Sequence, residues 1–477
     1  MNAPRERGLH DASGTLQRVF SVQRAAFASE RYPTFVARRD RLRRLRNLVT
    51  AHEDELVQAV SGDFGHRSAH ETRLAELYIV AAEARHAERN LRRWMKRRRV
   101  PTPIHLFPAS AFVMRQPLGV VGVISPWNYP VQLALAPVVG ALAAGNRVML
   151  KPSELTPATS ALLQRLIAQS FDEGELAVVT GDAQIGGAFT HLPFDHLFFT
   201  GSTAVGRKVA LAAADHLTPV TLELGGKSPA LFDVDADLHA TAPRLCIGKL
   251  LNAGQTCIAP DYALVPEARV DEFIAAIATA LPKLYAAFEH NPDYTAIVNE
   301  RHYERLARLV DDARKQGARI VDLGTGERAG RRMAPVLVVG VGDNMAIMRE
   351  EIFGPLLPIE TYTDLDDAIA KLQAREHPLA FYWFGDDAKR RDRVLRETLA
   401  GGVTVNDTLW HFAHQGLPFG GVGASGSGAY HGERSFLTFT QEKPVFVQPR
   451  VAATRLLYPP YGRVFERVLA LLRRLNA

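Results

Sequence analysis

The chain has little cysteine: its 477 residues include two, Cys246 and Cys257. So few thiols exclude a disulfide-stapled scaffold and are compatible with a reducing compartment. Long apolar runs are also missing, because the longest, residues 131–145, is interrupted by Gln132 and Pro137 and is too short to span a bilayer. The polar start MNAPRERGLHD has no apolar core of a signal peptide, so we expect a cytoplasmic protein.

A strong charge imbalance is absent too. The net charge is +6, with 47% hydrophobic and 23% charged residues, which excludes a disordered chain and favours about two to four globular domains. Much of the basic excess lies in residues 38–46 and 92–99. Such patches can bind nucleic acid or an acidic membrane. Apolar residues at helical spacing within 36–49 favour instead an amphipathic helix with a solvated basic face.

The order of the expected elements indicates an α/β protein. Residues 1–100 are helix-like, prolines interrupt the chain at 101–108, and strands then alternate with helices. The first series of strands comprises residues 120–125, 147–151, 196–200 and 220–222. A second α/β series begins after Leu224 with a strand at 229–233 and a helix across 240–253. This alternation predicts parallel sheets.

Three polar residues stand at positions suited to chemistry. Cys257, in NAGQTCI, follows an expected helix in a glycine-containing loop, whereas Cys246 lies in an apolar helical pattern typical of a buried cysteine. Glu223, in ELGGKSP, ends an apolar strand, and alone it also fits a surface ion pair. Asn128, in PWNYP, also fits a helix cap or an Asx turn.

Together these segments resemble the aldehyde dehydrogenase superfamily over residues 15–445. The runs GQTCIAPDY and PFGGVGASG are similar to its class 3 branch, which includes fatty-aldehyde and coniferyl-aldehyde enzymes. The resemblance implies two parallel-sheet α/β domains and a small β oligomerisation arm. The implied division is a dinucleotide-binding domain at 1–102 and 119–224, a catalytic domain at 225–415, the arm at 103–118 and 434–447, and a helical tail at 455–477.

The resemblance also implies the reaction, the NAD-dependent oxidation of an aldehyde to the carboxylic acid, with NADP also accepted. Cys257 is then the nucleophile, and the oxyanion accepts hydrogen bonds from the Asn128 side-chain amide and the Cys257 backbone N–H. Glu223 is then the general base that activates water to hydrolyse the thioester.

The run GSTAVG at 201–206 follows an expected strand and opens a helix, where glycines let the backbone approach a pyrophosphate. It differs from a P-loop because Arg207 and Lys208 replace the required Lys-Ser/Thr. By resemblance, Gly201, Ser202 and Gly206 contact the pyrophosphate, Lys151 and Glu154 the adenosine ribose, Glu351 the nicotinamide ribose, and Phe353 packs near the nicotinamide. No metal ligands are assigned.

Tyr129 and His411 lie beside the motifs and could line a substrate pocket. Trp127, Trp410 and Phe412 add aromatic surface suited to a hydrophobic, coniferyl-type aldehyde, although all of these side chains also fit a core. We expect a homodimer and no nucleic-acid partner. The apolar stripe of the tail predicts a helix that either packs on protein, such as the partner's substrate entrance, or binds an anionic membrane weakly.

Three alternatives stay open. A CoA-acylating dehydrogenase would hand the acyl group to CoA, a chemistry in which the base Glu223 has no use. A P-loop nucleotidase is disfavoured by Arg207 and Lys208. A silent structural or nucleic-acid-binding protein on the same fold is disfavoured by the complete set of Cys257, Glu223 and Asn128.

Overall fold

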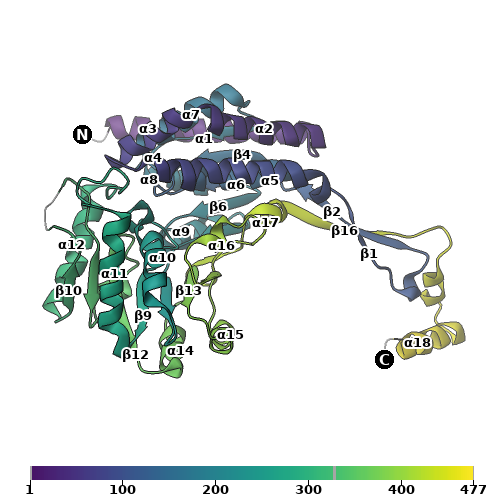
Figure 1. Ribbon diagram of the computed structural model, residues 1–477. Helices are drawn as coiled ribbons and strands as arrows, with labels where there is room; N and C mark the ends of the chain where they lie inside the picture. The colour runs from purple at the N-terminus through teal and green to yellow at the C-terminus, as the bar shows by residue number, and fades with distance from the viewer. Residues whose placement is uncertain (1–2, 326–328, 476–477) are drawn as a thin grey trace.

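The computed structural model describes residues 3–325 and 329–475. Residues 1–2 and 476–477, the outer ends of the expected first and last segments, lie outside the described residues. The chain forms a body of two α/β units and a long arm that leaves it on one side (Figure 1). This confirms the fold class expected from the sequence.

The N-terminal region is helical, as predicted. Its elements are α1 (Ala3–Ser29), α2 (Phe35–Ala51), α3 (Glu53–Phe64), α4 (Ala69–Thr72), the π-helical turn η1 (Arg73–Tyr78) and α5 (Ile79–Trp94). The expected solvated basic face of α2 is wrong in part, because Arg38 is 0% exposed and Arg41 is 4% exposed. Arg38 donates to the Ala144 carbonyl, and Arg41 pairs with Glu30 and Glu175. Arg38 therefore joins α2 to the end of α6, and Arg41 joins α2 to the residues that follow α1 and precede β5.

The first sheet has six strands in the order β15-β7-β6-β3-β4-β5. They are β3 (Val120–Ile124), β4 (Arg147–Lys151), β5 (Leu176–Val178), β6 (His196–Thr200), β7 (Val220–Glu223) and β15 (Gly426–Ser427), which alone runs antiparallel. The helices between them are α6 (Gln132–Ala144), α7 (Pro157–Ser170), α8 (Ala183–Thr190) and α9 (Thr203–Ala214). Val148 and Leu150 face one core while Met149 faces the other, so helices cover both faces.

The second sheet has seven strands in the order β10-β11-β12-β9-β8-β13-β14, antiparallel only between β10 and β11. The strands are β8 (Pro229–Phe232), β9 (Tyr262–Pro266), β10 (Arg319–Asp322), β11 (Val336–Val339), β12 (Leu356–Tyr362), β13 (Ala380–Phe384) and β14 (Gly402–Val405). The helices are α10 (Leu238–Leu250), α11 (Val270–Leu284), α12 (Glu300–Lys315), α13 (Ala346–Arg349), α14 (Leu365–Gln373), α15 (Ala388–Glu397) and α16 (Trp410–Ala413), with turns η3 (Leu251–Gly254) and η4 (Glu267–Arg269).

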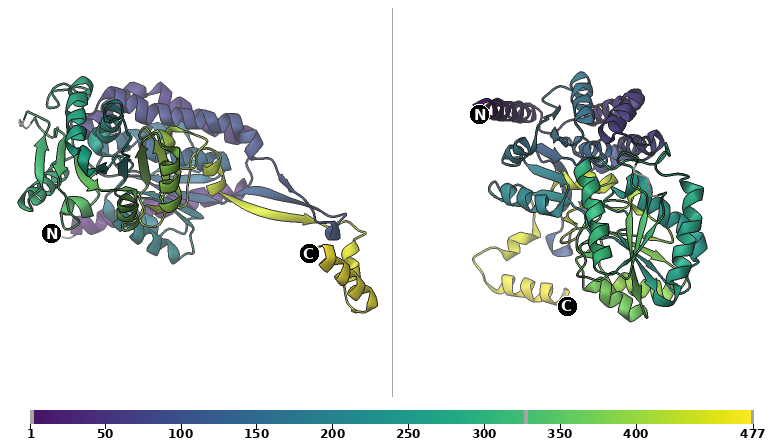
Figure 2. Two further views of the ribbon diagram at one scale, coloured as in Figure 1. Left: turned by 60° about the horizontal axis from the view of Figure 1, so that its bottom comes forward. Right: turned by 90° about the vertical axis from the view of Figure 1, so that its left-hand side faces the viewer.

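The arm is a three-stranded antiparallel sheet of β1 (Arg98–Val100), β2 (Ser110–Pro117) and β16 (Thr440–Val447). The predicted positions were partly wrong. The hairpin begins at β1, before residue 103, and residues 434–438 belong to the helix α17 (Gly432–Thr438). Beyond the strands come η2 (Ile104–Leu106), η5 (Ala453–Leu457) and α18 (Arg463–Leu475). The tail helix contacts η5 and lies at the far end of the arm, away from the two α/β units (Figure 2).

The parallel strands of the first sheet place their carboxyl ends along one edge, where ligands bind in open α/β sheets. Glu223 ends β7, Lys151 ends β4, Ser202 follows β6, and Asn128 follows β3. The tertiary fold thus gathers residues that are separated by up to about a hundred positions. In the described ranges, 3–325 and 329–475, no helix is both long enough and apolar enough to cross a membrane.

Candidate active site

The loop before Cys257 has an unusual backbone. The helix predicted over 240–253 ends earlier, at Leu250, and Asn252 and Ala253 then adopt left-handed φ values of 55° and 52°. Non-glycine residues hold this conformation only where their surroundings enforce it. Here the buried Gln255 side chain enforces it by donating to the Asn252 carbonyl at 2.9 Å and the Ala296 carbonyl at 3.1 Å. The cysteine is therefore presented by a rigid turn rather than by a helix.

Asn128 lies against that turn. Its side chain is buried, and its amide nitrogen Nδ2 donates to the Gln255 carbonyl at 3.1 Å. The Asn128 carbonyl in turn accepts from Asn252 Nδ2 at 2.9 Å. A carboxamide carries two N–H donors, so one remains for a ligand beside the cysteine loop. Asn128 is thus more than the helix cap or Asx turn that its sequence context also allowed.

The electrostatics around Cys257 are those of a buried acid cluster. Burial, with the nearby charges of Glu351 and Glu223, raises the pKa of the Cys257 thiol to about 12. Burial also raises the pKa of Glu223 well above its ordinary value, and neither Glu223 oxygen has a hydrogen-bond partner within the described chain. A carboxyl with a raised pKa and no protein partner is suited to exchange a proton with a small molecule. Glu223 therefore does not form the surface ion pair that its sequence also allowed.

Other predicted residues surround a surface that fits a dinucleotide. Ser202 caps the N-terminus of α9, and a Cβ on Gly206 would lie 2.6 Å from Leu224, so this helix approaches the strand end closely. A Cβ on Gly225 would lie 2.2 Å from the Glu351 carboxylate, whose Oε1 is buried without a partner in the described part of the chain. A helix N-terminus suits a pyrophosphate, and the free carboxylate oxygen suits ribose hydroxyls.

Lys151 and Glu154 lie beside this surface and beside each other. Lys151 is buried, and its Nζ pairs with Glu154 Oε2 at 3.2 Å. The carboxyl of Glu351, on the same surface, is also affected by its surroundings: burial raises its pKa to about 8.

The aromatic residues divide into two groups. Phe353 has a left-handed φ of 52° and packs edge-on against Trp127 at 5.4 Å, on the cysteine side of the body. The Tyr129 hydroxyl bonds Thr256 Oγ1, beside the cysteine, at 2.7 Å. His411 instead forms a hydrogen bond between its Nδ1 and Thr404 Oγ1.

Of the remaining aromatic residues beside the motifs, Phe412 packs on Phe419, and Trp410 is 62% exposed. His411 packs near Tyr382, whose hydroxyl donates to the Ile258 carbonyl next to Cys257.

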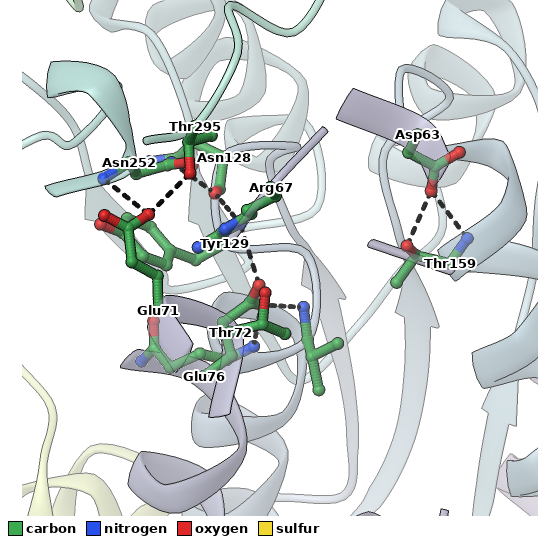
Figure 3. A network of polar contacts seen from close by, with 12 residues as sticks. Asp63, Arg67, Glu71, Thr72, Glu76, Asn128, Tyr129, Thr159, Asn252 and Thr295 are labelled. Atoms are coloured by element: carbon green, nitrogen blue, oxygen red, sulfur yellow. Dashed lines mark hydrogen bonds and ion pairs between the residues drawn. The ribbon is translucent and has the colours of Figure 1, made fainter. Parts of the chain in front are cut away.

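Sequence reasoning missed three buried charged residues in the segment before α5: Arg67, Glu71 and Glu76 (Figure 3). They contact the backbone of both the Asn128 turn and the cysteine loop. Their spacing on a helical segment is typical of solvated charges, so the sequence carries no local signal for their burial. Asn252 and Gln255 were also missed, although they flank Cys257 directly.

Residues 12–445 match the aldehyde dehydrogenase family. A probable coniferyl aldehyde dehydrogenase of Pseudomonas aeruginosa is 49% identical over 454 residues, which cover 95% of each protein. The substrate-bound state of Staphylococcus aureus AldH matches with a TM-score of 0.92 and 40% identity, over 96% of this chain and 99% of that one. An indole-3-acetaldehyde dehydrogenase in complex with NAD+ matches with a TM-score of 0.84 and 26% identity, over 92% and 89%.

The fold, the buried turn that precedes Cys257 and these similarities all indicate the same family. The chain belongs to the aldehyde dehydrogenase family, whose members oxidise aldehydes to carboxylic acids with a nicotinamide cofactor through a covalent cysteine intermediate.

Proposed function

We propose that this enzyme oxidises an aromatic or other large apolar aldehyde, of the coniferyl type, to its acid with NAD as the preferred cofactor. The observation that carries the proposal is the meeting of Cys257, Glu223 and the Asn128 turn at one edge of the first sheet. The P. aeruginosa relative is named for coniferyl aldehyde. Trp127 and Tyr129, beside the cysteine loop, supply apolar surface for an aromatic ring.

Cys257 is the proposed nucleophile. The thiol first loses its proton to solvent; the thiolate sulfur then forms a bond to the aldehyde carbon, and the electron pair of the C=O π bond moves to the oxygen, which gives the thiohemiacetal oxyanion. The oxyanion accepts hydrogen bonds from the free Asn128 amide N–H and the Cys257 backbone N–H, and losing one such donor typically costs about 3–4 kcal/mol of barrier. When bound, NAD accepts the hydride that leaves the aldehyde carbon. Glu223 then takes a proton from water, which hydrolyses the thioester and frees the thiol.

The proposed cofactor contacts follow the surface described above. Ser202, with Gly201 and Gly206, would hold the pyrophosphate at the start of α9. Lys151 and Glu154 would bind the adenosine ribose, while Glu351 would bind the nicotinamide ribose and Phe353 would pack near the nicotinamide. Tyr129 and His411 are the proposed residues on the substrate side. His411 would act through Tyr382, near which its ring packs.

The proposed domain division keeps the sequence boundaries for cofactor binding at 1–102 and 119–224, catalysis at 225–415 and the tail at 455–477, except that the arm expected at 103–118 and 434–447 is corrected to the strands β1, β2 and β16. The arm would pair with a second copy of the chain, since it projects from the body and exposes Ile104, Phe107 and Phe446. Large apolar side chains at such a place favour a protein partner. We therefore propose a homodimer, located in the cytoplasm, with at most weak membrane contact through α18.

Two measurements test the substrate and the assembly. A panel of aliphatic and aromatic aldehydes, assayed by NADH absorbance without CoA, should give the highest kcat/KM with coniferaldehyde-type compounds and acid as the product. Acetaldehyde or a phosphorylated aldehyde as the best substrate, or acid formed only when CoA is added, would contradict the proposal. Light scattering should give the mass of a dimer, and Phe446→Asp should shift it toward the monomer.

A further inference from the structure

A completely buried ion pair lies beside the Asn128 turn. Arg67 Nη1 and Glu76 Oε1 are 3.0 Å apart, and both side chains are 0% exposed. Removing two charges from water costs several kcal/mol per ion, so such a pair contributes little net stability. Its contacts therefore indicate what the pair does for this protein.

Arg67 and Glu76 each form hydrogen bonds with the backbone of the turn between β3 and α6. Arg67 Nη1 donates to the Asn128 carbonyl at 2.9 Å. Glu76 Oε2 accepts from the backbone N–H groups of Val131 at 2.6 Å and Gln132 at 3.1 Å. The ion pair thus connects the carbonyl of Asn128 to the first turn of the following helix.

The arginine also contacts the residue between these two anchors. Its guanidinium carbon lies 4.8 Å from the centre of the Tyr129 ring and 5.1 Å from that of Phe64. The Tyr129 hydroxyl bonds Thr256, the neighbour of Cys257. A guanidinium stacked on a ring restrains the orientation of that ring. The same arginine therefore acts on both Asn128 and Tyr129.

The cysteine loop is tied to the same segment. Glu71, one helical turn after Arg67, accepts from the Asn252 backbone N–H at 3.2 Å and from Thr295 Oγ1 at 2.7 Å. Asn252 Nδ2 donates to the Asn128 carbonyl that Arg67 also holds. One short segment, residues 67–76, consequently fixes the Asn128 turn and the left-handed part of the cysteine loop relative to each other (Figure 3).

We propose that Arg67, paired with Glu76, is a positioning residue for the oxyanion hole: it holds the Asn128 carbonyl so that the amide N–H left free by Gln255 points at the oxyanion. The side chain of Asn128 is anchored at Gln255 and its backbone at Arg67, which removes the freedom of the amide to turn away. Misplacing a reacting group by about 1 Å can slow a reaction roughly a hundredfold. The inference rests on the proposed roles of Cys257 and Asn128.

The test uses the neutral double variant Arg67→Met/Glu76→Gln. The new carboxamide keeps an oxygen for the N–H groups of α6, and no unpaired charge stays buried, so the melting temperature should stay close to wild type. The matched control is Arg390→Met/Asp233→Asn, which neutralises another ion pair with a fully buried carboxylate, at 2.6 Å. With NAD saturating and enzyme in excess over coniferaldehyde, at concentrations where the rate no longer rises with added enzyme, the single-turnover rate of NADH formation reports acylation independently of the fraction of folded enzyme.

We expect the Arg67/Glu76 variant to form NADH about 10- to 100-fold more slowly, with an unchanged Kd for NADH, and the control variant to keep the wild-type rate. Added to Asn128→Ala, the same pair of changes should slow the reaction less than about threefold further, because both act on one donor. A wild-type single-turnover rate in the double variant, or fully additive losses with Asn128→Ala, would overturn the inference. A normal rate in Asn128→Ala alone would instead overturn the proposed role of Asn128.

Discussion

Glu223 pairs across β7 and β15 with Gly426, so the glycine-rich run near the end of the chain holds the backbone of Glu223 in place. A Cβ on Gly426 would lie 2.3 Å from the Leu222 carbonyl, and its φ is 149°, so no other residue fits there without displacement. The position of the proposed base is thus set by a segment about two hundred residues away in sequence.

Glu223→Gln should separate the two half-reactions. Acylation needs Cys257, but hydrolysis of the thioester needs the base, so we expect at most one equivalent of NADH per active site and then very slow turnover. Stopped-flow absorbance measures the burst. Glu360→Gln, which removes another largely buried carboxylate, should retain turnover. Full steady-state activity of Glu223→Gln would refute the assigned role.

Cys257→Ala should lower kcat roughly a thousandfold or more, since no other group supplies the covalent nucleophile. NADH binding, followed by fluorescence titration, should change little. Cys246 is buried in the core and serves as the control: Cys246→Ala should keep most of the activity. Comparable losses in both variants would show that the effect comes from folding and not from chemistry.

Alkylation of Cys257 should be slow at neutral pH and should rise with pH. Burial and nearby negative charge raise the thiol pKa to about 12, so the reactive thiolate is scarce at pH 7 and increases about tenfold per pH unit. Iodoacetamide labelling of the cofactor-free protein carrying Cys246→Ala, followed by intact mass, measures the rate. A plateau reached by about pH 9.5 would show instead a thiol with an ordinary or lowered pKa.

Glu154→Gln should weaken the preference for NAD over NADP. In the proposed ribose site the Glu154 carboxylate would repel a 2′-phosphate, but its side chain is 43% exposed, so screening limits the effect to about 1 kcal/mol, or roughly fivefold in relative kcat/KM. The adjacent Lys151 attracts a phosphate, so we expect NAD to be preferred without excluding NADP. A wild-type enzyme with the higher kcat/KM for NADP would contradict this prediction.

Deletion of residues 463–477 should change KM for large aldehydes more than for small ones, and it should leave the melting temperature of the body unchanged. The reason is that α18 contacts η5 at the end of the arm and leaves Val464 and Leu471 exposed. Binding to anionic vesicles should be weak, salt-sensitive and lost with the deletion. If neither KM nor vesicle binding changes, the tail has no part in substrate handling.

Local patterns sufficed for much of the fold. Asn128 and Ser202 lie in strand-to-helix turns and Glu223 ends a strand, and these places could be predicted because an apolar strand that ends in glycine or polar residues is a local pattern. The end of α10 was placed too late, because Ala253 favours a helix and the single asparagine Asn252 costs only a fraction of a kcal/mol of helix propensity, up to about 0.7 kcal/mol. Hydrogen bonds of Asn252 with Gln255 and Glu71 enforce the left-handed backbone of these two residues. The local sequence at the helix end does not reveal these contacts.

The sequence by itself determined the family and was enough to propose Cys257 as the nucleophile and Glu223 as the base, since these depend on residue types in short motifs. Only the tertiary structure decided that Arg67 and Glu76 are buried against the Asn128 turn, and that α18 lies at the end of the arm. The physical reason is that the burial of a charge depends on which distant surface covers it. A helical segment with the same charges would be solvated if α6 and the cysteine loop did not pack against it.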